Sequence, residues 1–136
     1  MPHYKNFIME NYKMNTWYVN TNAKYCEDCY EYMLKQNRIA SWYNSAVNKI
    51  QQGDLILLHH NKKGFIAIGF ATSNFKQHFE FSEEEWIEVK WIFKDFDNPI
   101  NHNDIDFNGA FLRTVQNVSI DYKKLLIEMS KRAVTE

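Results

Sequence analysis

Two short apolar runs separated by a polar turn constrain the fold of this chain most strongly. Residues 55–58 read LILL and residues 65–71 read FIAIGFA, with the sequence NKKG between them at residues 61–64. Short apolar runs bounded by turn residues are typical of buried strands, and a short turn containing glycine joins two such strands into an antiparallel hairpin. The sequence therefore predicts a buried hairpin at the centre of a sheet.

Further strands are predicted on both sides of this hairpin. Residues 16–20 (TWYVN) are rich in β-branched and aromatic side chains, which favours a strand. Residues 86–93 alternate polar with apolar side chains, the period of a strand with one buried face, and this pattern directs Trp91 into the core. Residues 39–43 and 111–115 are also expected to be extended. Together these segments make about five or six short strands.

Helical patterns flank the predicted strands. Residues 24–36 carry apolar side chains at helical spacing opposite a charged stripe, and residues 45–51 are expected to form a helical turn. Asp121 is a suitable N-cap for a final amphipathic helix. The inner face of that helix is predicted to carry Leu125, Leu126 and Met129. The expected fold class is α+β, with a small curved sheet or open β-barrel and flanking helices.

The length of the chain, 136 residues, is that of one domain, and no linker rich in Pro, Gly or Ser divides it. We expect a lead-in segment over residues 1–14 and one folded domain over residues 15–136. No apolar run approaches the ~18–20 residues that cross a membrane, and no signal peptide is recognisable. Two cysteines are few for a disulfide-stabilised secreted protein, so the expected location is the cytoplasm and no membrane partner is expected.

The motifs that usually indicate catalysis or metal binding are incomplete. Cys26 and Cys29 have a metal-site spacing, but structural zinc needs a second ligand pair, so we expect both thiols to pack on a helix face. His59 and His60 are strand neighbours that point to opposite faces. The acidic run at residues 83–85 reads as a solvated loop, and no nucleophile lies in a recognisable elbow. No catalytic residue, metal site or cofactor is predicted.

Charge and aromatic content together favour a specific pocket over a broad binding surface. The formal net charge is −1, whereas a general nucleic-acid coat needs a basic excess. Aromatics make up 16% of the chain, and Trp42 lies outside any clear amphipathic pattern, where a ring suits stacking on a planar ligand. Residues 72–85 are polar with three phenylalanines among them, which indicates a long functional loop.

The order of these segments resembles the PUA-like superfamily, most nearly its EVE and YTH domains, from Trp17 to the end of the chain. The segments that carry the resemblance are residues 17–22, residues 39–43, residues 54–58 with residues 64–71, and residues 86–93, which contain the pattern V-x-W-I. The resemblance implies a binding domain that grips one modified base and is not an enzyme.

The resemblance also assigns roles to individual residues. Trp42 would be the cage tryptophan that stacks on the extruded base, and Arg113 would hold a backbone phosphate. The base-binding candidates are Trp42, Asn20, Thr21, Asn22, Tyr43, Phe75, Phe79 and Phe81. The phosphate-binding candidates are Arg113, Lys62 and Lys63. Extruding a base costs a few kcal/mol, which stacking, hydrogen bonds to the base edge and a phosphate contact can offset.

Two differences from the YTH pattern favour the bacterial EVE-like readers, including the N-terminal domains of McrBC-type restriction systems. Thr114 stands where YTH domains have aspartate, and the second cage tryptophan has no counterpart except the phenylalanines of residues 73–85. The preferred interpretation is a reader of methylated DNA that targets a fused or associated nuclease or AAA+ motor.

Three alternatives belong to other functional classes. An RNA reader of the N6-methyladenosine type would share the fold and require the 2′-hydroxyl group. A ribonuclease of the ASCH type would need a Lys/Tyr/Lys-like catalytic set, which is not recognisable here. A protein-interaction domain would present a flat aromatic patch in place of a concave cage.

Overall fold

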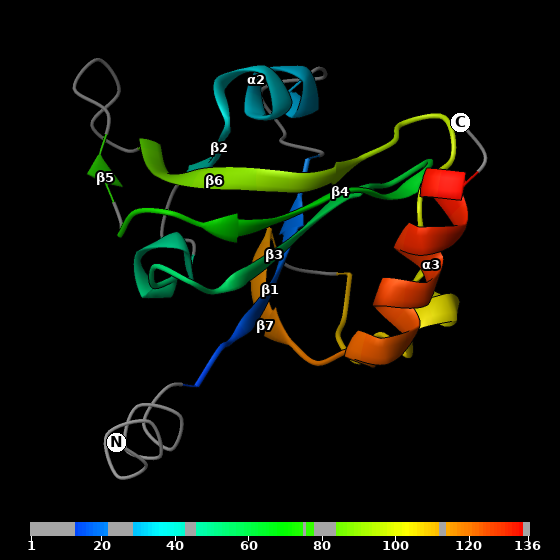
Figure 1. The fold of residues 1–136 in the computed structure, drawn as a ribbon. Coiled ribbons are helices and arrows are strands. Elements are labelled where there is room, and N and C mark those ends of the chain that lie inside the picture. Colours follow the sequence, from blue (N-terminus) through cyan, green and yellow to red (C-terminus); the bar gives the residue numbers. More distant parts are fainter. Residues whose placement is uncertain are drawn as a thin grey trace, which may run out of the picture.

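The computed structural model describes residues 13–21, 29–42, 46–74, 76–77, 84–111 and 114–134. Figure 1 shows one curled sheet with helices on two sides of it. The strands are β1 (Thr16–Asn20), β2 (Arg38–Trp42), β3 (Leu55–His60), β4 (Gly64–Ala71), β5 (Lys76–Gln77), β6 (Glu84–Lys94) and β7 (Val115–Val118). The helices are α2 (Cys29–Gln36) and α3 (Tyr122–Val134), and the 3-10 turns are η1 (Ala46–Lys49) and η2 (His102–Ile105).

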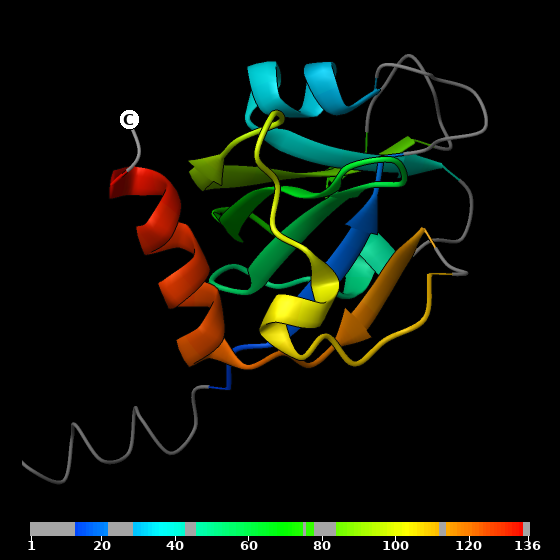
Figure 2. The same ribbon diagram turned by 90° about the vertical axis from the view of Figure 1, so that its right-hand side faces the viewer.

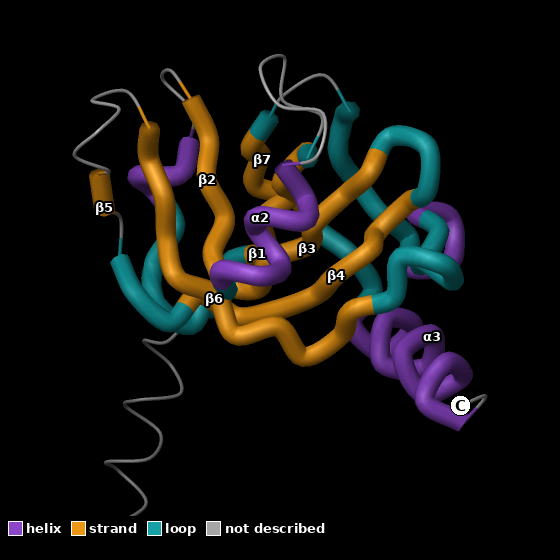
Figure 3. Tube along the Cα trace, turned by 90° about the horizontal axis from the view of Figure 1, so that it is seen from above, coloured by secondary structure: helices purple, strands orange, loops and turns teal. Residues whose placement is uncertain are grey.

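The strands form a mixed sheet in the order β2-β6-β4-β3-β1-β7, and β5 also pairs with β6. β1 and β3 run parallel, because the chain between them crosses over through α2, β2 and η1. The other strand pairs are antiparallel. Seen from above, the sheet curls into a half-barrel (Figure 3). The predicted α+β class, with a small curved sheet and flanking helices, is confirmed.

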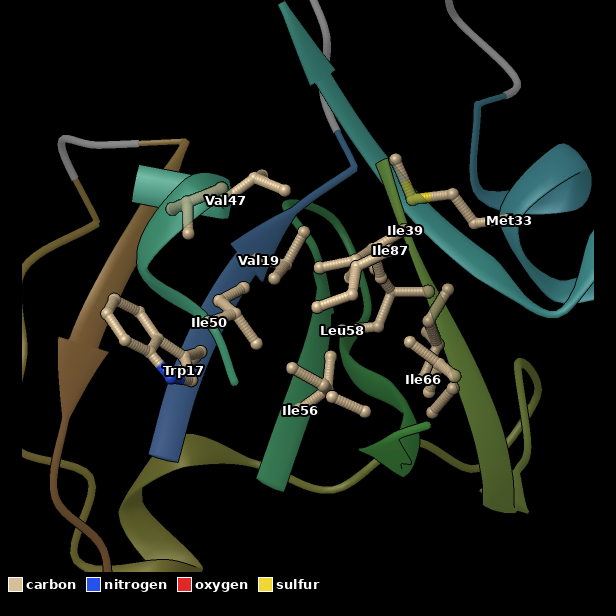
Figure 4. Close-up of a cluster of buried hydrophobic side chains, with 14 residues drawn as sticks. Trp17, Val19, Met33, Ile39, Val47, Ile50, Ile56, Leu58, Ile66 and Ile87 are labelled. Atoms are coloured by element: carbon tan, nitrogen blue, oxygen red, sulfur yellow. The ribbon is translucent and has the colours of Figure 1, made fainter. Parts of the chain in front are cut away.

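The concave side of the sheet holds the larger hydrophobic cluster. Figure 4 shows Val19 of β1, Val47 of η1 and Leu58 of β3 pointing into a shared interior. Met33 of α2 closes this cluster and is 2% exposed. The described side chains of this cluster fill the interior of the half-barrel.

The convex side holds a second cluster beneath α3 and η2. Tyr18 and Leu57 belong to it, whereas their sequence neighbours Val19 and Leu58 face the concave side. The alternation of β1 and β3 therefore supplies both clusters, as expected for strands buried on both faces. Leu125 of α3 is 4% exposed and joins the convex cluster.

β6 departs from its predicted alternation at Ile92. Trp91 packs against the concave cluster, as predicted, but Phe93 packs against the convex cluster. Gly69 pairs with Trp91 and Ile68 pairs with Phe93, so Ile92 is the extra residue of a β-bulge. The prediction that Trp91 and Phe93 share one face is wrong for this reason.

Two other local predictions are wrong. The strand expected at residues 111–115 lies instead at Val115–Val118, where it pairs with β1. Phe111 and Thr114 are not in a strand, and residues 112–113 lie outside the described residues. The loop expected over residues 72–85 contains β5, and β6 already begins at Glu84. Backbone pairing with Ser41 and Gln77 places Glu85 in a strand and not in a solvated loop.

The final helix begins where the sequence predicts. Asp121 accepts the backbone N–H of Lys124 at 3.0 Å, which is the expected N-cap contact. Leu126, however, is 62% exposed, because α3 approaches the sheet through Leu125 and Met129. The prediction that Leu126 faces the core is therefore wrong. None of the described helices is long and apolar enough to cross a membrane.

Candidate nucleic-acid interface

Four strand ends form one edge of the half-barrel, which we call the rim. The rim comprises the end of β1 at Asn20 and Thr21, the end of β2 at Trp42, the start of β6 at Glu84, and the start of β7 at Val115. These ends lie along one side of the molecule in Figure 3, and on the side away from α3 in Figure 2.

Backbone pairing joins these ends in two groups. Trp42 pairs with Glu84, while the Asn20 N–H donates to the Thr114 carbonyl at 2.8 Å beside the start of β7. Between the two groups stands η1, whose Val47 packs in the same cluster as Val19 of β1 (Figure 4). The crossover segment thus brings the end of β2 to the same edge as the end of β1.

Several of the predicted site residues lie outside the part of the chain that the structure describes. Asn22, Tyr43, Phe75, Phe79, Phe81 and Arg113 lie outside the described residues, as does Cys26. Their described sequence neighbours are at the rim: Thr21 precedes Asn22, Trp42 precedes Tyr43, and Thr114 follows Arg113. The segment over residues 78–83 is flanked by Gln77 and Glu84, both next to the end of β2 through the pairing of β6.

Thr21 has a structural role at the rim. It is 2% exposed, and both its backbone N–H and its hydroxyl donate to the carbonyl oxygen of His59, at 2.9 Å and 3.0 Å. The hydroxyl proton is therefore already used within the fold. Asn20, the last residue of β1, is partly exposed at the same edge.

The β3–β4 hairpin next to Thr21 carries the two predicted phosphate lysines. Lys62 and Lys63 are exposed, and the ammonium group of Lys63 lies 4.8 Å from the ring centre of Phe96. His60 accepts the Lys62 N–H at 3.2 Å through Nδ1. Burial, followed by repulsion from the two lysines, lowers the pKa of His60. The imidazole stays neutral beside two cations, so the positive charge of the hairpin is carried by the lysines.

A cluster of rings behind the rim was missed by sequence reasoning. His59 is 8% exposed, and its ring centre lies 4.9 Å from that of Phe111 and 5.0 Å from that of Phe65. Tyr18 places its hydroxyl oxygen 3.3 Å from His59 Nδ1. The prediction that His59 and His60 point to opposite faces is confirmed, because His59 faces the convex cluster while His60 contacts Tyr30 and Phe96.

Burial keeps the Tyr18–His59 pair uncharged at neutral pH. It raises the pKa of Tyr18 to about 12. Burial, followed by repulsion from His102 and His60, lowers the pKa of His59 to about 4. The backbone of His59 holds Thr21 while its ring supports Phe111, so one residue links the end of β1 to the loop before β7. Within the described part of the chain, no group of His, Cys, Asp and Glu is arranged to hold a metal ion.

A family model described as "Domain of unknown function (DUF8426)" matches residues 5–119. The chain belongs to this family. Every strand of the sheet lies within the DUF8426 match, and so do the rim and the ring cluster, whereas α3 follows it. A search of curated proteins found no match.

Proposed function

We propose that this protein is a nucleic-acid-binding module that reads a modified base, with methylated DNA as the preferred ligand. The proposal rests on the resemblance to EVE and YTH domains and is carried by one structural observation. The strand ends that flank the predicted base and phosphate contacts converge at the rim, although β1, β2 and β7 are far apart in the sequence.

The physical chemistry of the rim suits an extruded base. Trp42 supplies a ring for stacking, which contributes roughly 1–3 kcal/mol per base. Asn20 supplies an amide for the base edge. Lys62, Lys63 and Arg113 supply cations for the phosphates on either side. A net charge of −1 implies modest affinity without the specific contacts, because few phosphates are neutralised.

A domain that only binds requires an effector. We propose a nuclease or AAA+ motor, present by fusion or association, with the restriction-type systems of the cytoplasm as the setting. In this arrangement the rim recognises the modified site and the effector carries out the reaction, so the domain itself needs no catalytic residues and no cofactor.

The test is fluorescence anisotropy with matched DNA duplexes that carry 5-methylcytosine, 5-hydroxymethylcytosine, N6-methyladenine or no modification. Trp42→Ala should abolish discrimination among the duplexes. Phe70→Ala is the control, because Phe70 is an exposed ring that pairs with Leu55 at the far end of β3 from His60. The double variant Lys62→Ala/Lys63→Ala should weaken all duplexes alike and reduce the salt slope by about 1–2.

Equal affinity for all four duplexes, unchanged in Trp42→Ala, would exclude a DNA base reader. The same modifications placed in RNA decide the alternative within this fold. Discrimination seen only in RNA and lost on removal of the 2′-hydroxyl would replace DNA by RNA as the ligand.

A further inference from the structure

The convex face of the sheet is covered incompletely by α3, and a groove of about 400 Å³ lies between α3 and the end of β6. Its apolar floor is formed by Ile92, Phe93, Leu126 and Met129. Leu126 is 62% exposed and Ile92 is 46% exposed. These exposed apolar side chains make the groove a candidate interaction surface. Figure 2 shows α3, which lines the groove, on the side of the molecule away from the rim.

The groove is held open by contacts at both ends of α3. At the C-terminal end, the guanidinium of Arg132 donates to the carbonyl oxygens of Asn98 and Pro99, each at 2.7 Å. At the N-terminal end, the Lys124 ammonium group lies 2.8 Å from the Asp106 carboxylate. The helix is therefore fixed relative to the sheet, and a partner would meet a preformed surface, which lowers the entropic cost of binding.

Charges of both signs border the apolar floor. Asp95 lines the groove, and its carboxylate accepts the Asn98 N–H at 2.8 Å. Lys94 lines the groove, and Lys123 lies one helical turn before Leu126. Neither lysine forms an ion pair within the described residues. Glu128, by contrast, is paired with Lys131 at 2.9 Å and with the Arg132 guanidinium at 3.3 Å. In a chain of net charge −1, this face presents unpaired cations beside exposed aliphatic side chains.

We propose that this groove docks a short amphipathic helix of a protein partner, with apolar side chains on the floor and carboxylates toward Lys94 and Lys123. Helix-in-groove recognition uses apolar residues at spacings of i, i+3, i+4 and i+7, and charge complementarity fixes its orientation. The proposal stands apart from the base-reading function. Because the rim and the groove lie on opposite sides, a helix bound in the groove leaves the rim accessible.

The test uses the full chain and two fluorescein-labelled synthetic helices with identical leucine positions, one on a glutamate background and one on a lysine background. The glutamate peptide should raise the anisotropy with an affinity about ten-fold or more above that of the lysine peptide. Leu126→Glu should weaken the glutamate peptide by about ten-fold or more. Ile127→Glu is the matched control, since Ile127 is 45% exposed on the same helix but does not line the groove.

Three results would overturn the proposal. Equal binding of the two peptides would show that charge does not contribute to recognition. Equal losses of peptide affinity in Leu126→Glu and Ile127→Glu would show that the peptide does not bind in the groove. A concentration-dependent dimer in sedimentation velocity, lost in Leu126→Glu and kept in Ile127→Glu, would assign the groove to a second copy of this chain. Circular dichroism of both variants verifies that they are folded. Peptide binding by the wild-type chain is expected to continue at saturating duplex DNA.

Discussion

Mild acid should destabilise this protein through His59. The His59 side chain is 8% exposed among the rings of Tyr18, Phe65 and Phe111, and burial lowers its pKa from 6.5 to about 4. Between these values the unfolded chain binds a proton that the folded chain does not. The contribution of His59 to stability is therefore complete above pH 6.5 and is lost as the pH falls toward 4.

The size of the effect follows from the shift. Each pKa unit corresponds to about 1.4 kcal/mol, so the fall from pH 6.5 to pH 5 removes at most about 2 kcal/mol. Solvent screening through the exposed part of the ring reduces this to about 1–2 kcal/mol. Domains are stable by about 5–15 kcal/mol in total, so a loss of this size is measurable.

The loss of stability is measured by urea unfolding, followed by tryptophan fluorescence, at about pH 7.5, 6.5, 5.5 and 5.0. These conditions extend from above the unfolded pKa of His59 down toward its folded pKa. The variant His59→Leu removes the titrating group and should flatten the pH dependence, whereas His60→Leu, at the more exposed neighbour, should keep most of it. Parallel pH profiles for the wild-type protein and His59→Leu would refute the reasoning. So would an NMR titration of the His59 ring with its midpoint at the ordinary value for histidine.

Two further predictions concern single contacts in the fold. Gly69→Ala should lower the free energy of unfolding by about 2–3 kcal/mol in urea titrations. The added Cβ would lie 2.6 Å from the Lys90 carbonyl oxygen and 2.6 Å from Val89 Cγ1. A loss below about 0.5 kcal/mol would show that the site accommodates the methyl group. Trp17→Phe should cost about 1–3 kcal/mol, since Trp17 Nε1 donates at 2.9 Å to the carboxylate of Asp54, which is 3% exposed. Trp91→Phe is its control and should cost less, because Trp91 Nε1 donates at 3.2 Å in a partly buried setting; equal losses would show that ring packing, and not the Asp54 contact, is responsible.

The parts of the fold that sequence predicted correctly are those specified by local pattern. β1 has its predicted bounds, and β3 and β4 form the predicted hairpin, where Gly64 adopts a φ of 124° that other residues rarely adopt. β7 was misplaced, because residues 111–115 have the stronger local preference while Val115–Val118 has the partner in β1. Pairing across the sheet overrides local preference in such a case.

The sites could be predicted only where sequence neighbours mark them. Trp42 and Asn20 end strands that the local pattern identified, so their place at the rim follows from the topology. The contact of His59 with Phe111 and that of β6 with α3 join segments far apart in the chain. No periodicity within a short window carries that information, which is why the ring cluster and the groove emerge only from the fold.

The bulge at Ile92 links the stability of the sheet to the proposed docking groove. In a regular strand Trp91 and Phe93 would both face the concave cluster, and the floor of the groove would lose the Phe93 ring. Gly69 admits the bulge, since any side chain there would meet the Lys90 carbonyl. β-Bulges are common beside functional surfaces. The bulge at Ile92, opposite Gly69, fits this expectation. Gly69→Ala should therefore disturb binding of the glutamate peptide as well as stability, while Trp17→Phe, on the concave side, should lower stability and leave the peptide affinity unchanged.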